Sequence, residues 1–245
     1  MTPKIRYFLK YNLSLLAFGL LLTFFSSFGQ TFLLSLYVPS IEELLGISNT
    51  EFGTIYAVAT IGSAITLPWL GGYFDKIHTT GYTLMVIGGL MIALLLLSFS
   101  YHVILVVLGF YGLRLFGQGL MTHTSVSTMA RYFGLDRGKA IGAASLGHPA
   151  GEASLPILIT LLMGVIGWRG ALQVSALTCA LVVAPLAIFL LSRSKIRIRA
   201  YRMQNHAARE GKRKVEVRKI FRDRRFWIIT PVIFMIGFTT TAIFF

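Results

Sequence analysis

Long apolar segments that follow one another at short intervals are the feature that most restricts the fold of this chain. A helix rises about 1.5 Å per residue, so about 20 apolar residues are enough to cross the hydrocarbon of a bilayer. In lipid, backbone groups must bond within their own segment, which predicts helices and an all-α, polytopic membrane bundle. The predicted spans are residues 11–38, 51–73, 81–100, 102–130, 140–166, 170–191 and 226–245.

Composition supports a membrane protein and excludes an ordinary soluble domain. Of the 245 residues, 55% are hydrophobic and 13% are charged, whereas a soluble domain carries about 25% charged residues. Cys179 is the single cysteine, which excludes an internal disulfide and a cysteine metal cluster. We therefore expect no cofactor. An enzyme is not expected either, because the histidines are scattered and no nucleophile or acid cluster is evident.

The positive charge follows the predicted loops. The formal net charge is +14, and all of the 23 Lys and Arg residues except Arg114 and Arg169 lie in the N-terminal tail or in alternate loops. This distribution is typical of a multi-pass membrane protein whose basic loops face the cytoplasm. It predicts a cell (inner) membrane protein with the N-terminus and residues 192–225 cytoplasmic. The basic residues of that loop suit anionic lipid headgroups better than nucleic acid, so no nucleic-acid partner is expected.

A weak internal repeat connects the first three spans with the next three. Phe28-Gly29-Gln30 matches Phe116-Gly117-Gln118 at an offset of 88 residues, and Pro68 and Pro156 share that offset. Equivalent helices that cross the membrane in opposite directions leave such matches, with the binding site between them. We therefore predict two three-helix inverted repeats.

The fourth and fifth spans each carry one ionisable residue near the middle, Arg114 and Glu152. As antiparallel helices joined by the charged turn at residues 131–139, they place both side chains roughly 20–25 Å from that turn. A charge at that depth costs several kcal/mol unless it has a partner, water or a function. We predict that Arg114 and Glu152 face each other, and that a substrate carboxylate at Arg114 favours proton uptake by Glu152. The alternative is a permanent buried pair that only fixes two helices.

Other polar residues share helix faces with these charges. Gln118 follows Arg114 by four residues, His148 precedes Glu152 by four, and Gln30 lies in a weaker polar stripe of the first span. The two glutamines suit hydrogen bonds to substrate and hydrogen bonds between helices equally well. His148 suits a proton path, or the capping of backbone carbonyls loosened by the proline that follows it. The predicted substrate and proton pathway comprises Arg114, Glu152, Gln30, Gln118 and His148.

Three glycine-containing motifs lie at or within the predicted helices. Gly71-Gly-Tyr-Phe-Asp75-Lys76 lies at the end of the second span, Arg114 precedes Gly117-Gln118-Gly119 in the fourth, and Gly147-His-Pro-Ala-Gly151 lies in the fifth. Together they resemble the major facilitator superfamily, which has Gly-x-x-x-Asp-Arg/Lys between its second and third helices. The fourth and fifth helices of that family carry an Arg/Gly and a Gly-Pro-rich motif. The resemblance covers essentially all 245 residues.

The resemblance implies a helix bundle of major-facilitator type and a division of the chain. Residues 1–191 correspond to a six-helix bundle, 192–225 to a basic cytoplasmic linker, and 226–245 to a seventh helix that starts a C-terminal half. It implies a gate latch at Gly71, Gly72, Asp75 and Lys76. Close helix packing or kinks around a cavity are expected at Gly117, Gly119, Pro149, Gly151 and Pro156.

The function that these features predict is secondary transport of a small solute by alternating access. The two buried charges favour a small organic anion coupled to protons. The alternatives are an exporter of amphipathic drugs, or a non-transporting membrane scaffold or fragment. The expected partners are a small-molecule substrate, protons, the lipid bilayer, and a missing C-terminal half or a second half-transporter, without which we expect no transport.

Overall fold

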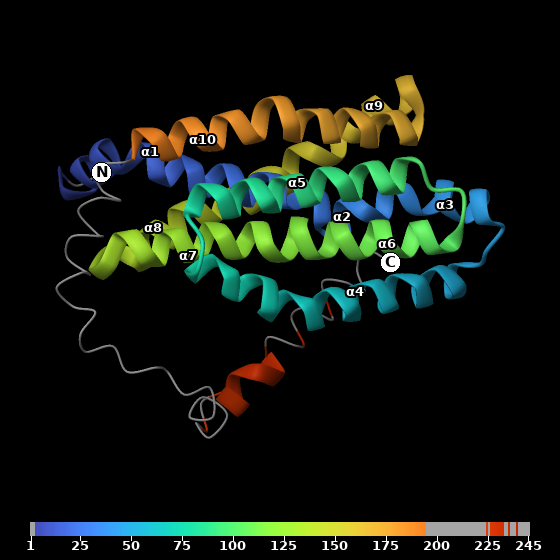
Figure 1. Ribbon diagram of the computed structural model, residues 1–245, viewed down its shortest axis with the longest axis horizontal. Coiled ribbons are helices and arrows are strands. Elements are labelled where there is room, and N and C mark those ends of the chain that lie inside the picture. Colours follow the sequence, from blue (N-terminus) through green and yellow to red (C-terminus); the bar gives the residue numbers. More distant parts are fainter. Residues whose placement is uncertain (1–2, 195–223, 225, 233–234, 236–238, 240–245) are drawn as a thin grey trace. The chain divides into compact units, whose positions relative to one another are not determined.

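The computed structural model describes residues 3–194, 224, 226–232, 235 and 239, with side chains from residue 12 onward (Figure 1). The chain divides into two units, residues 1–196 and 197–245. In the second unit, residues 226–232 are helical. Most of the predicted linker and much of the predicted seventh span lie outside the described residues.

Helices account for the regular structure of the described part of the chain. The α-helices are α1 (Pro3–Phe25), α2 (Thr31–Leu34), α3 (Val38–Leu45), α4 (Asn49–Gly72), α5 (Thr79–Ser98), α6 (Val103–Gly112), α7 (Thr122–Phe133), α8 (Arg137–Ser145), α9 (Gly147–Thr178) and α10 (Ala184–Arg193). Short 3-10 turns occupy Ser26–Gly29, Ser35–Tyr37, Tyr73–Asp75 and Gly134–Asp136. π-helical segments occupy Leu113–Met121 and Cys179–Val183.

Among the described residues, four stretches are long and apolar enough to cross a membrane. They are Asn12–Gly29, Asn49–Asp75, Thr79–Ser98 and Val103–Arg193. The last has 91 residues, which at about 1.5 Å per residue is far longer than the ~30 Å of bilayer hydrocarbon. Positive φ angles at Gly134 (53°) and Gly167 (73°) break it, and the resulting helical rods run back and forth along the bundle (Figure 1).

The first predicted span is the one that differs most from expectation. Residues 11–38 were expected to form one helix, but α1 ends at Phe25 and Gln30 takes an extended conformation (φ −83°, ψ 148°). Short helical pieces follow, and α3 occupies most of residues 39–50, which lie between the first two predicted spans. The break falls on a run of small and polar residues from Ser26 to Gln30, whose side chains compete with helical backbone bonding.

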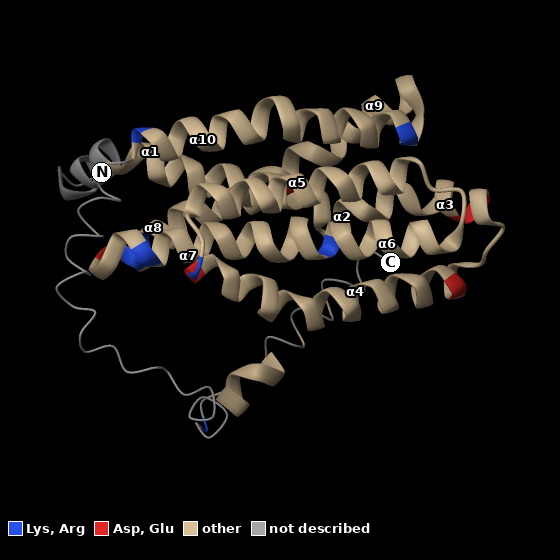
Figure 2. Cartoon of the chain, in the orientation of Figure 1, with Lys and Arg blue, Asp and Glu red and all other residues tan. Residues whose placement is uncertain are grey.

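Side-chain burial and charge agree with a bundle surrounded by lipid. On α4, Phe52 and Ala59 are buried against the bundle, whereas Ile61, Ile65 and Trp69 are exposed. Charged residues gather mainly at the ends of the helices, and few lie along their length (Figure 2). Apolar exposure with charge mainly at the helix ends suits a bilayer rather than water.

Arg169 stabilises the turn that follows the break at Gly167. Arg169 donates hydrogen bonds to the carbonyls of Ser98 (3.1 Å), the last residue of α5, and of Ser100 (2.9 Å), which follows it. Its guanidinium lies between the rings of Tyr101 and Trp168, 4.5 and 4.6 Å from their centroids. These contacts satisfy the carbonyls left free at the end of α5 and hold the second part of α9 beside that helix.

Candidate functional site

The fourth predicted span changes its helical pitch in the middle. Between α6 and α7, residues Leu113–Met121 form a π-helix that contains Arg114 and Gln118. π-helical turns inside α-helices are rare and often mark functional sites, because the extra residue per turn leaves backbone groups and side chains in unusual positions.

The break in the first span lies directly against this π-helix. A Cβ atom placed on Gly29 would collide with the Leu113 carbonyl oxygen and the Gln118 nitrogen, and would lie 2.9 Å from the Gly117 Cα. A Cβ on Gly117 would in turn lie 2.8 Å from the Cα and N of Gly29. The two glycines therefore allow a backbone-to-backbone contact that a side chain on either would block.

Arg114 joins the two elements at this contact. Its Nη1 donates to the Gly29 carbonyl (3.4 Å) and to the Thr31 hydroxyl (3.2 Å), the residues on either side of Gln30. Its guanidinium carbon lies 5.3 Å from the centroid of the Tyr56 ring, and the Tyr56 hydroxyl lies 3.1 Å from Thr31 Oγ1. The Arg114 Nε is buried and has no hydrogen-bond partner among the described residues. Arg114 thus retains a free donor beside its fixed ones.

The predicted pairing of Arg114 with Glu152 is not found. Glu152 is exposed on α9. The ion pairs among the described residues are Arg131–Asp75 and Lys139–Asp136. Equal depth along two helices does not determine the direction in which their side chains point. The oxygen atoms that Arg114 contacts come instead from the broken backbone of the first span. Counting residues along the helices could not predict that break.

The other predicted pathway residues lie around the same contact. His148 Nδ1 is 3.3 Å from the Ser26 hydroxyl, so its partner is a side chain rather than a loosened backbone carbonyl. Gln30 and Gln118 are both half-buried. Neither side-chain amide forms a hydrogen bond within the described part of the chain.

The glycines and prolines predicted to shape the helices have distinct surroundings. A Cβ on Gly151 would collide with the Ser27 hydroxyl, and one on Gly119 would lie 2.9 Å from a Leu67 methyl group. Pro149 is the third residue of α9, and Pro156 lies inside that helix.

Two residues of this cluster, Thr31 and Tyr56, were not predicted from the sequence. Thr31 follows directly on the Phe28-Gly29-Gln30 motif, so a search for polar side chains beside the repeat would have found it. Tyr56 carried no such signal, because a lone aromatic residue in an apolar span usually packs against other helices.

The predicted gate latch joins the ends of α4 and α7. Arg131 forms an ion pair with Asp75, donates to the Phe74 carbonyl (3.3 Å), and lies 4.1 Å above the Phe74 ring. Of the two glycines, Gly71 faces the His123 ring, at 3.6 Å from an added Cβ, whereas Gly72 has open space beside it.

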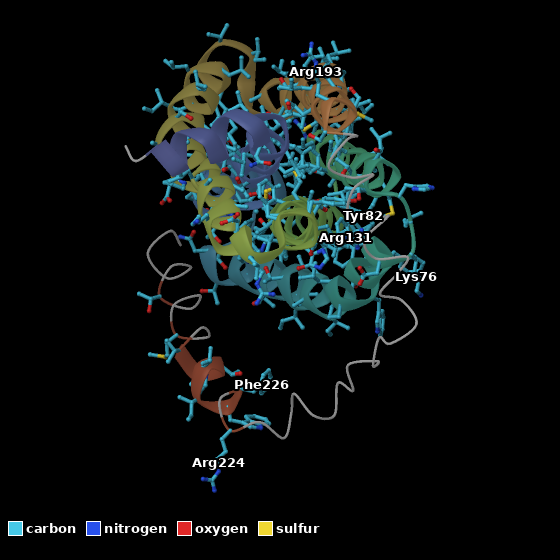
Figure 3. All side chains as sticks on the ribbon, turned by 90° about the vertical axis from the view of Figure 1, so that its left-hand side faces the viewer. Lys76, Tyr82, Arg131, Arg193, Arg224 and Phe226 are labelled. Carbon is cyan, nitrogen blue, oxygen red and sulfur yellow. The ribbon has the colours of Figure 1, made fainter. Side chains whose placement is uncertain are left out.

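Lys76 is the most peripheral of the predicted latch residues. It is exposed, and its ammonium group lies over the Tyr73 ring at 4.8 Å. Figure 3 shows Lys76, Arg131 and Arg193 at the same end of the bundle.

The latch yields a prediction about its two partners. Replacing Asp75 with asparagine should lower the free energy of unfolding by less than about 1 kcal/mol, because that carboxylate is largely exposed. Arg131→Ala should cost about 1–3 kcal/mol, because it also removes the contacts with Phe74. Cys179 is free and buried, so its reaction with a thiol-specific dye during heating reports unfolding. Asp136→Asn is the matched control, and equal losses for Asp75→Asn and Arg131→Ala would contradict the prediction.

Comparison with known proteins identifies the family. The model of the Major Facilitator Superfamily matches residues 19–245. The chain belongs to this superfamily. It is therefore a multi-pass membrane protein of a transporter family, not of an enzyme family, as the sequence motifs predicted.

Two curated relatives of this superfamily member match at a distance. It is 27% identical over 135 residues to human "Monocarboxylate transporter 11", a match that covers 54% of this chain and 26% of the relative. It is 28% identical over 215 residues to "Sucrose permease" from Escherichia coli, covering 83% of this chain and 48% of the relative. The chain thus spans about a quarter and about half of the lengths of these relatives. No solved structure matches it significantly.

Proposed function

We propose that this protein is a secondary transporter that moves a small organic anion by alternating access, with Arg114 as the group that binds the carboxylate. The observation that carries the proposal is the buried, unpartnered Nε of Arg114 beside donors already held by Gly29 and Thr31. A guanidinium binds carboxylates through two parallel hydrogen bonds, and it is less strongly hydrated than an ammonium group. An arginine that is held in place and keeps a free donor is therefore suited to bind an anion.

The relatives favour two different substrates. The name of the human relative refers to monocarboxylates, which agrees with an arginine site. The bacterial relative is a sucrose permease and aligns with more of this chain, so a neutral saccharide is the second candidate. A neutral ligand would leave the charge of Arg114 without a counter-charge at membrane depth, and we therefore favour the anion.

The same helices support a proposal about symmetry and orientation. Gly46 and Gly134 both have positive φ (63° and 53°) and are 88 residues apart, as are Gly29 and Gly117, which touch. We infer two three-helix inverted repeats that meet at this glycine contact.

The end of the bundle that carries Lys76, Arg131 and Arg193 is proposed to be cytoplasmic, because basic residues concentrate on that side of a membrane.

Proton coupling is proposed to use Glu152. Its carboxyl is exposed on α9, one turn after His148, and no basic residue of the described chain holds it in an ion pair. We expect Glu152→Gln to lose uptake driven by an inward proton gradient and to retain exchange of labelled for unlabelled substrate, which needs no net proton movement. Both are measured in proteoliposomes that contain the chain together with its expected C-terminal half, with Glu43→Gln as the exposed control. Gradient-driven uptake by Glu152→Gln at the unmodified rate would refute the role.

The substrate class is tested with three labelled solutes of different charge. Proteoliposomes containing this chain together with its expected C-terminal half are offered lactate, succinate or sucrose, with and without a pH gradient. The proposal expects uptake of at least one carboxylate and none of sucrose. Uptake of sucrose alone would establish the saccharide alternative, and uptake of none of the three above protein-free vesicles would contradict the anion proposal.

A further inference from the structure

Two glutamine side chains lie beside the proposed anion site without hydrogen bonds. Gln30 and Gln118 are both half-buried, and within the described part of the chain neither amide has a partner. An amide carries two donors and an acceptor oxygen. Neither amide is among the buried side-chain groups that lack a partner, so both remain accessible to water or to a ligand.

Arg114 and the two glutamines belong to a single helix crossing. Arg114 donates to Gly29 and Thr31, which flank Gln30 on both sides. Gln118 lies one turn after Arg114 in the same π-helix, and its backbone nitrogen faces Gly29. The two glutamines therefore belong to the two segments that meet at Arg114, the extended break in the first span and the π-helix.

Ordinary structural roles do not account for Gln30. Its backbone nitrogen donates to Ser27 (3.0 Å), and its carbonyl accepts from Leu33 and Leu34 (both 3.1 Å). It occupies the N-cap position of α2, where Ser, Thr, Asp and Asn are preferred because their side chains cap the helix. The Gln30 side chain makes no such capping bond.

A helix-linking role is absent for Gln118 as well. Its side chain forms no hydrogen bond to the described side chains of α1 or α4, although both helices contact the π-helix. The contact between the two spans is made instead by the glycines and by Arg114. The choice between substrate binding and helix linking, which the sequence left open for both glutamines, therefore favours substrate binding.

We propose that Gln30 and Gln118 bind hydroxyl groups of the transported anion, so that the substrate class is a hydroxylated carboxylate such as a hydroxy acid or a sugar acid. This inference rests on the proposed function, because it takes the carboxylate to be bound at Arg114. A hydroxyl both donates and accepts a hydrogen bond, as an amide does, so each glutamine satisfies one hydroxyl. An aliphatic acid of the same length leaves both amides unpaired, and sites built around hydrogen bonds reject such analogues strongly.

Matched acid pairs test the proposal on the protein in nanodiscs. Competition binding compares glycerate with propanoate, and gluconate with hexanoate, so that each pair shares its carboxylate and carbon number. In the unmodified protein, the hydroxylated member of at least one pair is expected to bind about 10-fold more tightly or better. Gln30→Met and Gln118→Met keep the side-chain length and should each lower that ratio by roughly 3–10-fold. Gln173→Met, at an exposed position of α9, should leave it unchanged.

The possible outcomes distinguish a failure of this inference from a failure of the proposed function. Equal binding of both members of both pairs to the unmodified protein would overturn the inference while leaving an anion site intact, and this comparison requires no variant to fold. An unchanged ratio in both glutamine variants, with Cys179 still protected from thiol reagent, would overturn it as well. Failure of all four acids to bind would instead contradict the anion site at Arg114.

Discussion

Carboxylate uptake by Arg114→Gln is expected to fall about 100-fold or more at low substrate concentration, equivalent to about 2.8 kcal/mol. The glutamine removes the guanidinium charge at this site and the Nε donor, which has no partner among the residues that the structure describes. Hydrogen bonds that involve charged groups contribute about 1.5–3 kcal/mol each, so the loss of a pair of them accounts for the factor. The measurement is initial uptake of the carboxylate identified with labelled solutes.

Two further arginine variants show whether this loss of uptake comes from the charge and geometry of Arg114 itself. Arg114→Lys keeps the charge but loses the paired geometry of the guanidinium, so it should retain more uptake than Arg114→Gln and less than the unmodified protein. Arg193→Gln removes an exposed charge at the end of α10 and should leave uptake unchanged. Full uptake by Arg114→Gln, in protein whose Cys179 remains protected, would show that the anion binds elsewhere.

Gly29→Ala is expected to destabilise the bundle by about 3 kcal/mol and to reduce the yield of folded protein sharply. The added methyl group would overlap the Leu113 carbonyl oxygen and the Gln118 nitrogen. Because these are backbone atoms of the π-helix, no side-chain rotation relieves the overlap, and the two spans must separate. Reaction of Cys179 with a thiol-specific dye during heating measures the loss in detergent.

A glycine elsewhere in the bundle supplies the control for this substitution. A Cβ on Gly88, inside α5, would meet no atom within 4 Å. Gly88→Ala should therefore be neutral or slightly stabilising, because alanine is the better helix former. Gly117→Ala should resemble Gly29→Ala, since each glycine faces the other. Equal thermal stability of Gly29→Ala and Gly88→Ala would contradict the close contact.

Much of the architecture could be predicted from the sequence, because the physical effects that determine it act within a single segment. The length of an apolar segment decides whether it crosses a bilayer, and within lipid a segment of about 20 residues satisfies its own backbone groups by forming a helix. Residues 49–72 and 79–98 are accordingly helical within a few residues of the expected bounds. The motif around Asp75 and the position of Arg114 identified the superfamily, because both depend on spacing within one segment.

Tertiary structure alone decided what those residues contact. The break at Gln30 brings carbonyl and hydroxyl oxygens to Arg114, and Glu152, at similar depth, is exposed instead of paired. Depth follows from counting residues along a helix, whereas a side chain's direction depends on how helices rotate and approach one another. That approach is determined here by two glycines 88 residues apart in the sequence, whose importance arises only when their backbones touch.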